Sequence, residues 1–115
     1  MREPADPASP DKVFERNWAL TLLELVLERL RVEQAVAGKG AQFEQLQDCL
    51  MGSSDAPRYA VLAGRIGLHE EAVRMEVSRL RRRYRKLLRE EIGQTVSRPS
   101  EIEEEIGHLF AALGN

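Results

Sequence analysis

Residues Tyr59 to Arg89 read YAVLAGRIGLHEEAVRMEVSRLRRRYRKLLR, and this stretch decides the fold. It begins with a short apolar segment that ends at Gly67 and continues with a longer segment in which arginines are frequent. Glycine adopts a positive φ without strain, so Gly67 marks a sharp change of direction between two helices. The stretch therefore predicts two helices joined by a three-residue turn, which is the arrangement of a helix-turn-helix.

Three further positions fit this interpretation. Ala63 is small where the two helices would cross, Val73 is placed to anchor the second helix, and Leu68 is expected to fill the turn from the core side. The same spacing also occurs in helical hairpins that have no DNA-binding role. A second signal is therefore needed before a function can be inferred.

Charge supplies that second signal. Between Arg65 and Arg89 there are nine Arg or Lys and three Glu, in a chain whose formal net charge is −2. Positive charge gathered on one element is what contact with DNA phosphates requires. Charge runs also occur on plain solvated helices, and Glu90, Glu91 and the acidic last helix can form weak surface pairs with some of the arginines. The arginines exceed what such pairing needs, which favours phosphate contact.

Composition bounds the remaining possibilities. A length of 115 residues supports one domain, with at most an appended arm. The single cysteine, Cys49, excludes an internal disulfide, favours a reducing cytoplasm and reads as a buried apolar residue. Two distant histidines offer neither a metal site nor a nucleophile–base pair, and no apolar run approaches the roughly 20 residues that span a membrane. We therefore expect no enzyme activity, no cofactor and no membrane partner.

Glycine and proline residues mark the expected ends of the helices, and the sequence predicts an all-α fold without a sheet. The expected architecture is a five-helix bundle that contains the helix-turn-helix, of the winged-helix-like or sigma region 4 type. Residues 1–10 read as a flexible linker in which Ser9 caps the first helix. The helical domain is expected at 11–96, with the helix-turn-helix at 58–92, and an appended C-terminal helix at 97–115 with Ser100 and Glu103 as its capping box. The first four helices are expected at about 10–37, 41–51, 58–66 and 70–92, with Pro10 at the first helical position.

Apolar spacing predicts which side chains are buried. Val73, Val77, Leu80, Tyr84 and Leu87 form one stripe on the second helix of the pair. The first helix carries a broad apolar surface with two adjacent stripes, and Trp18 is expected in the core. The stripes of the first helix are Phe14, Trp18, Leu22 and Leu25, and Leu20, Leu23, Leu27 and Leu30.

Three strings together resemble the C-terminal region 4 of bacterial extracytoplasmic-function sigma factors, of a type common in planctomycetes. They are FERNWALTLLELVLERLR (14–31), YAVLAGRIGLHEEAVRMEVSRLRRRYRKLLREEI (59–92) and EIEEEIGHLFAAL (101–113). The flanking strings are more specific than the helix-turn-helix string. The resemblance implies recognition of the minus-35 promoter element and docking on the β flap of the RNA polymerase core, with an anti-sigma protein as a further partner. It also implies that the chain is part of a longer sigma factor.

Two residues depart from that pattern. His69 stands where the family usually has the Ser or Thr that caps the recognition helix, and Glu76 stands where many relatives have a basic or small residue. Glu76 would repel phosphate if it faced DNA. We expect it to face sideways.

The first turns of a recognition helix reach base edges in the major groove, and later turns lie nearer the phosphates. Glu71 can accept a hydrogen bond from cytosine, Arg74 can donate to guanine or to phosphate, and Met75 can touch a thymine methyl group. Glu70 and Glu71 have a second interpretation, because acids in a first turn complement the helix dipole. The predicted base-reading residues are Glu70, Glu71, Arg74, Met75 and Ser78, and the predicted phosphate-binding residues are Arg79, Arg81, Arg82 and Arg85.

Two other functions remain open at this point. A free-standing helix-turn-helix regulator would dimerise through its first or last helix, to match two half-sites on DNA. A protein-interaction module would instead use the arginine face to bind an acidic partner. Salt-dependent DNA affinity separates the first two functions from the third.

Overall fold

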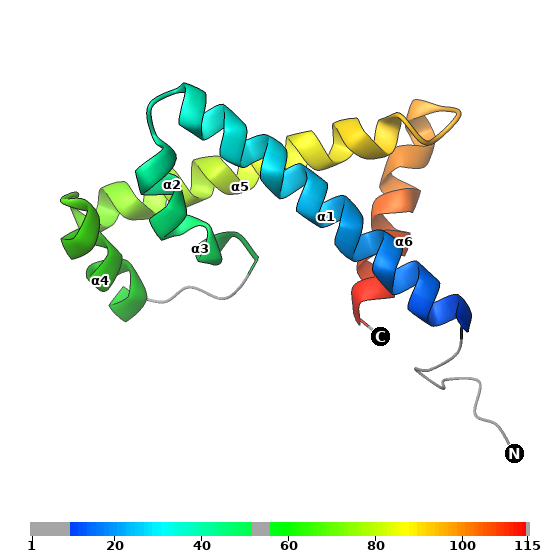
Figure 1. Cartoon of the computed structure of the whole chain (residues 1–115), viewed down its shortest axis with the longest axis horizontal. Coiled ribbons are helices and arrows are strands. Elements are labelled where there is room, and N and C mark those ends of the chain that lie inside the picture. The colour runs from blue at the N-terminus through cyan, green and yellow to red at the C-terminus, as the bar shows by residue number, and fades with distance from the viewer. Residues whose placement is uncertain (1–9, 52–55, 115) are drawn as a thin grey trace, which may run out of the picture. The chain divides into compact units, whose positions relative to one another are not determined.

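The computed structural model describes residues 10–51 and 56–114, and those residues contain helices and no strand (Figure 1). The all-α prediction is confirmed. The chain order is α1 (Pro10–Val36), α2 (Gly40–Leu46), α3 (Asp48–Met51), α4 (Ala56–Ile66), α5 (Glu70–Gly93), the 3-10 helix η1 (Pro99–Glu101) and α6 (Ile102–Gly114). The Ser9 cap and all of the predicted linker except Pro10 lie outside the described residues.

The prediction of five helices is wrong in number, because the segment expected as one helix at 41–51 forms both α2 and α3. The Leu50 N–H bonds the Gln47 carbonyl at 3.1 Å, three residues back instead of four. This tighter turn interrupts the helix at Gln47 and leaves α3 one turn long.

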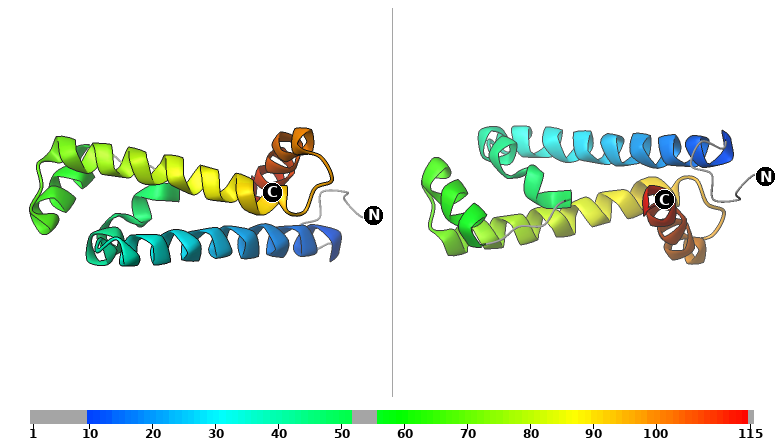
Figure 2. Two further views of the ribbon diagram at one scale, coloured as in Figure 1. Left: turned by 90° about the horizontal axis from the view of Figure 1, so that it is seen from above. Right: turned by 90° about the horizontal axis from the view of Figure 1, so that it is seen from below.

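Contacts between residues divide the chain into two compact units. Of the described residues, the first unit contains 10–27 and 87–114, and the second contains 28–51 and 56–86. Helices α1 and α5 therefore contribute residues to both units. Figure 2 shows α5 (Glu70–Gly93), coloured from light green to yellow, as one uninterrupted helix.

The second unit has a core built from α1, α2, α3, α4 and α5. Phe43 and Leu46 of α2 are almost fully buried, and α2 contacts α4. The predicted stripe residues Val73, Val77 and Leu80 are also buried, and burial raises the pKa of Tyr84 to about 12. The other apolar core residues of this unit are Leu30, Cys49, Tyr59, Leu62 and Ala63. The predicted burial of Cys49 is confirmed, and Ala63, expected where the two helices cross, is buried as well.

The first unit has its own apolar core, formed by α1, the end of α5 and α6. Leu109 of α6 is fully buried, and so is Leu87, the last residue of the predicted stripe on α5. The other buried residues of this unit are Ala19, Leu23, Val26, Leu88 and Ile92.

Glycines end two helices in the left-handed conformation. Gly67 ends α4 with φ of 86°, and the Ala63 carbonyl accepts the N–H groups of Gly67 and Leu68 at 2.9 and 3.1 Å. The predicted turn at Gly67 is thus confirmed. Gly38 follows α1 with φ of 81°, and there the Lys39 N–H bonds the Gln34 carbonyl at 2.8 Å. Only glycine adopts this conformation at low cost, so both turns depend on it.

Three expectations about individual side chains are wrong. Trp18 is 36% exposed and Leu68 is 38% exposed, so neither is a core residue. The buried residues of α1 are Ala19, Leu23, Val26 and Leu30. Two of them belong to the second predicted stripe and none to the first, so Trp18, in the first stripe, faces solvent. The cap before α6 uses Glu101, whose Oε1 accepts the N–H groups of Ser97 and Arg98 at 2.9 and 3.0 Å. A 3-10 turn precedes α6, so this cap lies two residues earlier than the predicted Ser100–Glu103 box.

Candidate nucleic-acid interface

Most of the residues predicted to contact DNA lie on the solvent-exposed side of α5. Val73, Val77 and Leu80 define the buried side of the helix. At about 100° per residue, the predicted set falls mainly on the opposite side. Among its members, Glu71, Arg74, Met75, Ser78, Arg79, Arg82 and Arg85 are exposed, and Glu70 and Arg81 are half-buried.

The two units differ strongly in charge. Residues 28–86 contain twelve Lys and Arg against eight Asp and Glu, a formal charge of +4. The rest of the chain contains five against eleven, a formal charge of −6. The net charge of −2 therefore conceals a cationic unit, and that unit contains most of α5.

Two arginines of α5 form hydrogen bonds to other helices of the second unit. Arg81 donates from Nε and Nη2 to the Cys49 carbonyl at 3.1 and 2.7 Å, so it satisfies a carbonyl near the end of α3. Arg83 donates from Nε to Oε1 of Glu33 at 2.8 Å, and this hydrogen bond lowers the pKa of the Glu33 carboxyl. These contacts tie α5 to α3 and α1.

The cations on the exposed side of α5 have fewer partners. Within the described part of the chain, Arg85 and Lys86 form no hydrogen bond or ion pair through their side chains. Arg82 Nη1 is 3.4 Å from the Ser78 hydroxyl, which is a weak contact at this distance. Arg74 lies over the Tyr59 ring of α4, with its guanidinium carbon 4.9 Å from the ring centroid. These four cations are therefore available to an anionic partner.

Glu76 is the buried charged residue of this region, with 9% of its surface exposed. Its Oε2 accepts a hydrogen bond from Gln42 Nε2 at 2.9 Å and lies 3.5 Å from Lys39 Nζ, and its Oε1 pairs with Arg79. It therefore points towards the start of α2, as the sideways orientation expected from the sequence requires. Sequence reasoning missed Lys39 and Gln42, since they precede Glu76 by more than thirty residues and no local pattern connects them.

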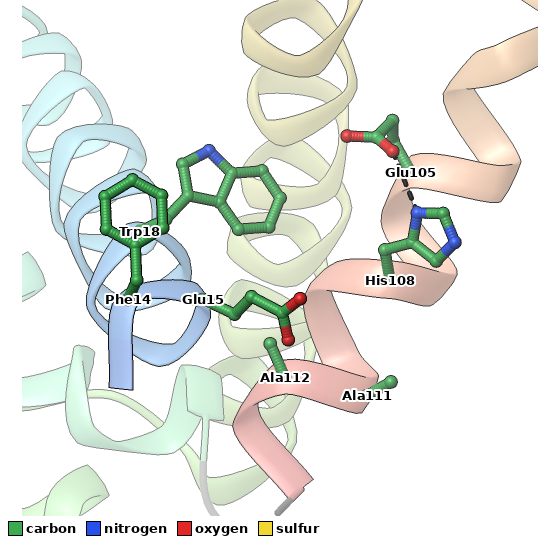
Figure 3. Close-up of a pocket in the computed structure, with 7 residues that line it drawn as sticks. All are labelled: Phe14, Glu15, Trp18, Glu105, His108, Ala111 and Ala112. Carbon is green, nitrogen blue, oxygen red and sulfur yellow. Dashed lines mark hydrogen bonds and ion pairs between the residues drawn. The ribbon is translucent and has the colours of Figure 1, made fainter. Parts of the chain in front are cut away.

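The first unit has a separate pocket of about 460 Å³ between α1 and α6. Figure 3 shows the Phe14 and Trp18 rings on α1, and Glu105 and His108 on α6. His108 Nδ1 is 2.9 Å from Glu105 Oε1, and this hydrogen bond raises the pKa of the His108 imidazole. Three further residues complete the lining, which are Glu15, Ala111 and Ala112.

The described residues contain no cluster of His, Cys, Asp and Glu that could hold a metal ion. None of their helices is long and apolar enough to cross a membrane. Comparisons of the chain with protein-family models, with curated proteins and with solved structures found no significant match.

Proposed function

We propose that this chain binds promoter DNA during transcription initiation, as the minus-35-recognising region 4 of a sigma factor. In this proposal α4, the turn at Gly67 and α5 form a helix-turn-helix with α5 as its recognition helix. The observation that carries the proposal is a group of exposed cations on α5, which are Arg82, Arg85 and Lys86. Within the described residues, their side chains form at most one weak hydrogen bond, from Arg82 to Ser78. The charge of +4 on residues 28–86 supports it.

The two ends of the exposed side have different roles in this proposal. Glu71, Arg74 and Met75 lie in the first turns of α5, where a recognition helix reaches base edges. Arg82 and Arg85 lie further along, where the phosphate backbone is closer. Arg81 has a carbonyl partner in Cys49, so we assign it to holding α5 in place and keep Arg79, Arg82 and Arg85 for phosphates.

Base reading can be tested separately from phosphate binding. Arg74→Ala and Glu71→Ala are expected to reduce discrimination between promoter sequences, by about 1–3 kcal/mol for a good base contact. Arg85→Ala is the control, because removal of a phosphate-binding side chain weakens binding to all sequences alike. The measurement is competition binding on a set of single-base promoter variants. An unchanged sequence preference in Arg74→Ala and Glu71→Ala would contradict the assigned reading positions.

A second function, contact with a protein partner such as the RNA polymerase core, is favoured by the aromatic surface of the first unit. Phe14 is 76% exposed and Trp18 is 36% exposed, beside a pocket that Glu15 and Glu105 also line. Contiguous exposed apolar surface on a protein often marks a site that binds a partner.

Trp18 is the single tryptophan and can report on this surface directly. In the free chain we expect iodide or acrylamide to quench its fluorescence readily, because the indole is partly exposed. Binding of RNA polymerase core is expected to shift the emission to the blue and reduce quenching, with Trp18→Phe as the blank for polymerase fluorescence. If core bound with Trp18 quenching unchanged, contact through this surface would be excluded.

A further inference from the structure

Two cations, Lys39 and Arg79, converge on Glu76. Arg79 reaches its carboxylate from one turn further along α5, and Lys39 reaches it from the turn between α1 and α2. Although both are paired, they keep much of their surface in solvent, since the Lys39 side chain is 46% exposed and that of Arg79 is 57% exposed. The Glu76 side chain is only 11% exposed. A buried carboxylate thus holds two exposed cations.

The carboxylate does not use all the donors of these two groups. A guanidinium has five N–H donors and an ammonium has three. Arg79 gives a hydrogen bond from Nη1 to Glu76, and Lys39 Nζ lies 3.5 Å from the other carboxylate oxygen. Donors therefore remain on both side chains for an external anion, and the three groups together carry one net positive charge.

The Lys39 backbone is fixed from both sides. The Gly38 N–H bonds the Ala35 carbonyl at 3.1 Å and the Lys39 N–H bonds the Gln34 carbonyl at 2.8 Å, a Schellman ending of α1. The Lys39 carbonyl accepts the Phe43 N–H at 2.9 Å, which starts α2. Lys39 therefore approaches α5 from an ordered turn, and little backbone freedom is given up when it binds an anion.

The two cations line one groove of about 310 Å³ beside α5. Leu68, Ala72 and Met75 provide apolar surface in this groove, and Met75 is 57% exposed. A sugar–phosphate backbone combines an apolar sugar with an anionic phosphate, so it matches this combination of groups. An acidic side chain would match the cations but would leave the apolar surface uncovered.

We propose that Lys39 and Arg79, held by Glu76, form a phosphate clamp for the DNA strand that runs along this edge of α5. The inference rests on the proposed function and adds to it a contact from outside the α4–α5 pair. It also gives a positioning role to Glu76, the one acidic residue between Arg74 and Arg89. The clamp binds the phosphate irrespective of sequence, because it has no group directed at a base edge.

The test uses Lys39→Ala, Arg79→Ala and the double variant in a salt titration of binding to duplex DNA. Each single change is expected to make the slope of log affinity against log salt shallower by about one unit, and the double change by about two. Affinity should fall alike on all sequences. Arg31→Ala is the control for the removal of charge alone, because Arg31 is an exposed cation paired with Glu28 on α1. Circular dichroism confirms that each variant is folded, and Lys39→Gln replaces Lys39→Ala if the latter unfolds.

Three outcomes would overturn the clamp, and the first of them separates it from the wider proposal. If Lys39→Ala and Arg79→Ala kept the full slope while Arg82→Ala made it shallower, DNA binding would stand and the clamp would be wrong. If the unmodified chain showed no salt dependence, the clamp and the proposed function would both fail. If Lys39→Ala and Arg79→Ala changed the slope only as much as Arg31→Ala does, the loss of net charge would explain the effect. That result would also overturn the clamp.

Discussion

Replacing both Arg82 and Arg85 with alanine is expected to weaken DNA binding on the order of fiftyfold at about 0.1 M salt, because two phosphates are no longer neutralised. Both residues are exposed on α5, and Arg85 has no side-chain partner within the described residues. Removal of these two side chains should therefore leave the fold of the second unit intact. The slope of log affinity against log salt should become shallower by about two units, and sequence preference should be kept.

The control for this double variant is Arg16→Ala combined with Arg98→Ala, which removes two positive charges from the first unit. It should change DNA affinity far less, because those charges lie outside the proposed interface. Equal effects of the two double variants in a fluorescence-anisotropy titration would mean that net charge alone drives binding. The assignment of α5 as the DNA-contacting helix would then be wrong.

Phe43→Ala is expected to lower the free energy of unfolding by about 3–5 kcal/mol, the range for truncation of a buried aromatic side chain. Phe43 is 1% exposed and lies among the largest side chains of the second unit's core. Typical domains are stable by about 5–15 kcal/mol, so the expected decrease is a large part of the total. Urea denaturation followed by circular dichroism measures it.

Val61→Ala provides the matched control in the same unit, because Val61 on α4 is 56% exposed. Its effect should stay within about 0.5 kcal/mol, as for other surface substitutions. A decrease below about 1 kcal/mol for Phe43→Ala would show that α2 is not part of a cooperative core. The position of Lys39 beside α5 would then lack support, since α2 begins directly after Lys39.

The α4–α5 pair could be predicted because its signals are local. Gly67 marks the turn by its own conformational freedom, and the spacing of Val73, Val77 and Leu80 follows the helical period. On α1 the helical period did not identify a single buried side. Apolar residues occupy several sides of that helix. Its buried residues are Ala19, Leu23, Val26 and Leu30, and Ala19 belongs to neither predicted stripe.

The partners of charged side chains could not be predicted, because they depend on residues distant in sequence. Arg81 and Arg83 look like their neighbours in the sequence, yet they stand at the two borders of the buried stripe and meet α3 and α1. Arg82, between them, faces solvent. The same distance in sequence hid the contact between Glu76 and Lys39. A prediction of phosphate contacts from an arginine run therefore needs the orientation of the helix.

The most direct test of the proposed DNA binding is a salt titration of the unmodified chain with duplex DNA. Four to six phosphate contacts predict a slope of log affinity against log salt of roughly −4 to −5. Such a slope would support a cationic interface on α5. A flat response between low and physiological salt would contradict it, and would leave the exposed arginines of α5 without the phosphate-binding role assigned to them.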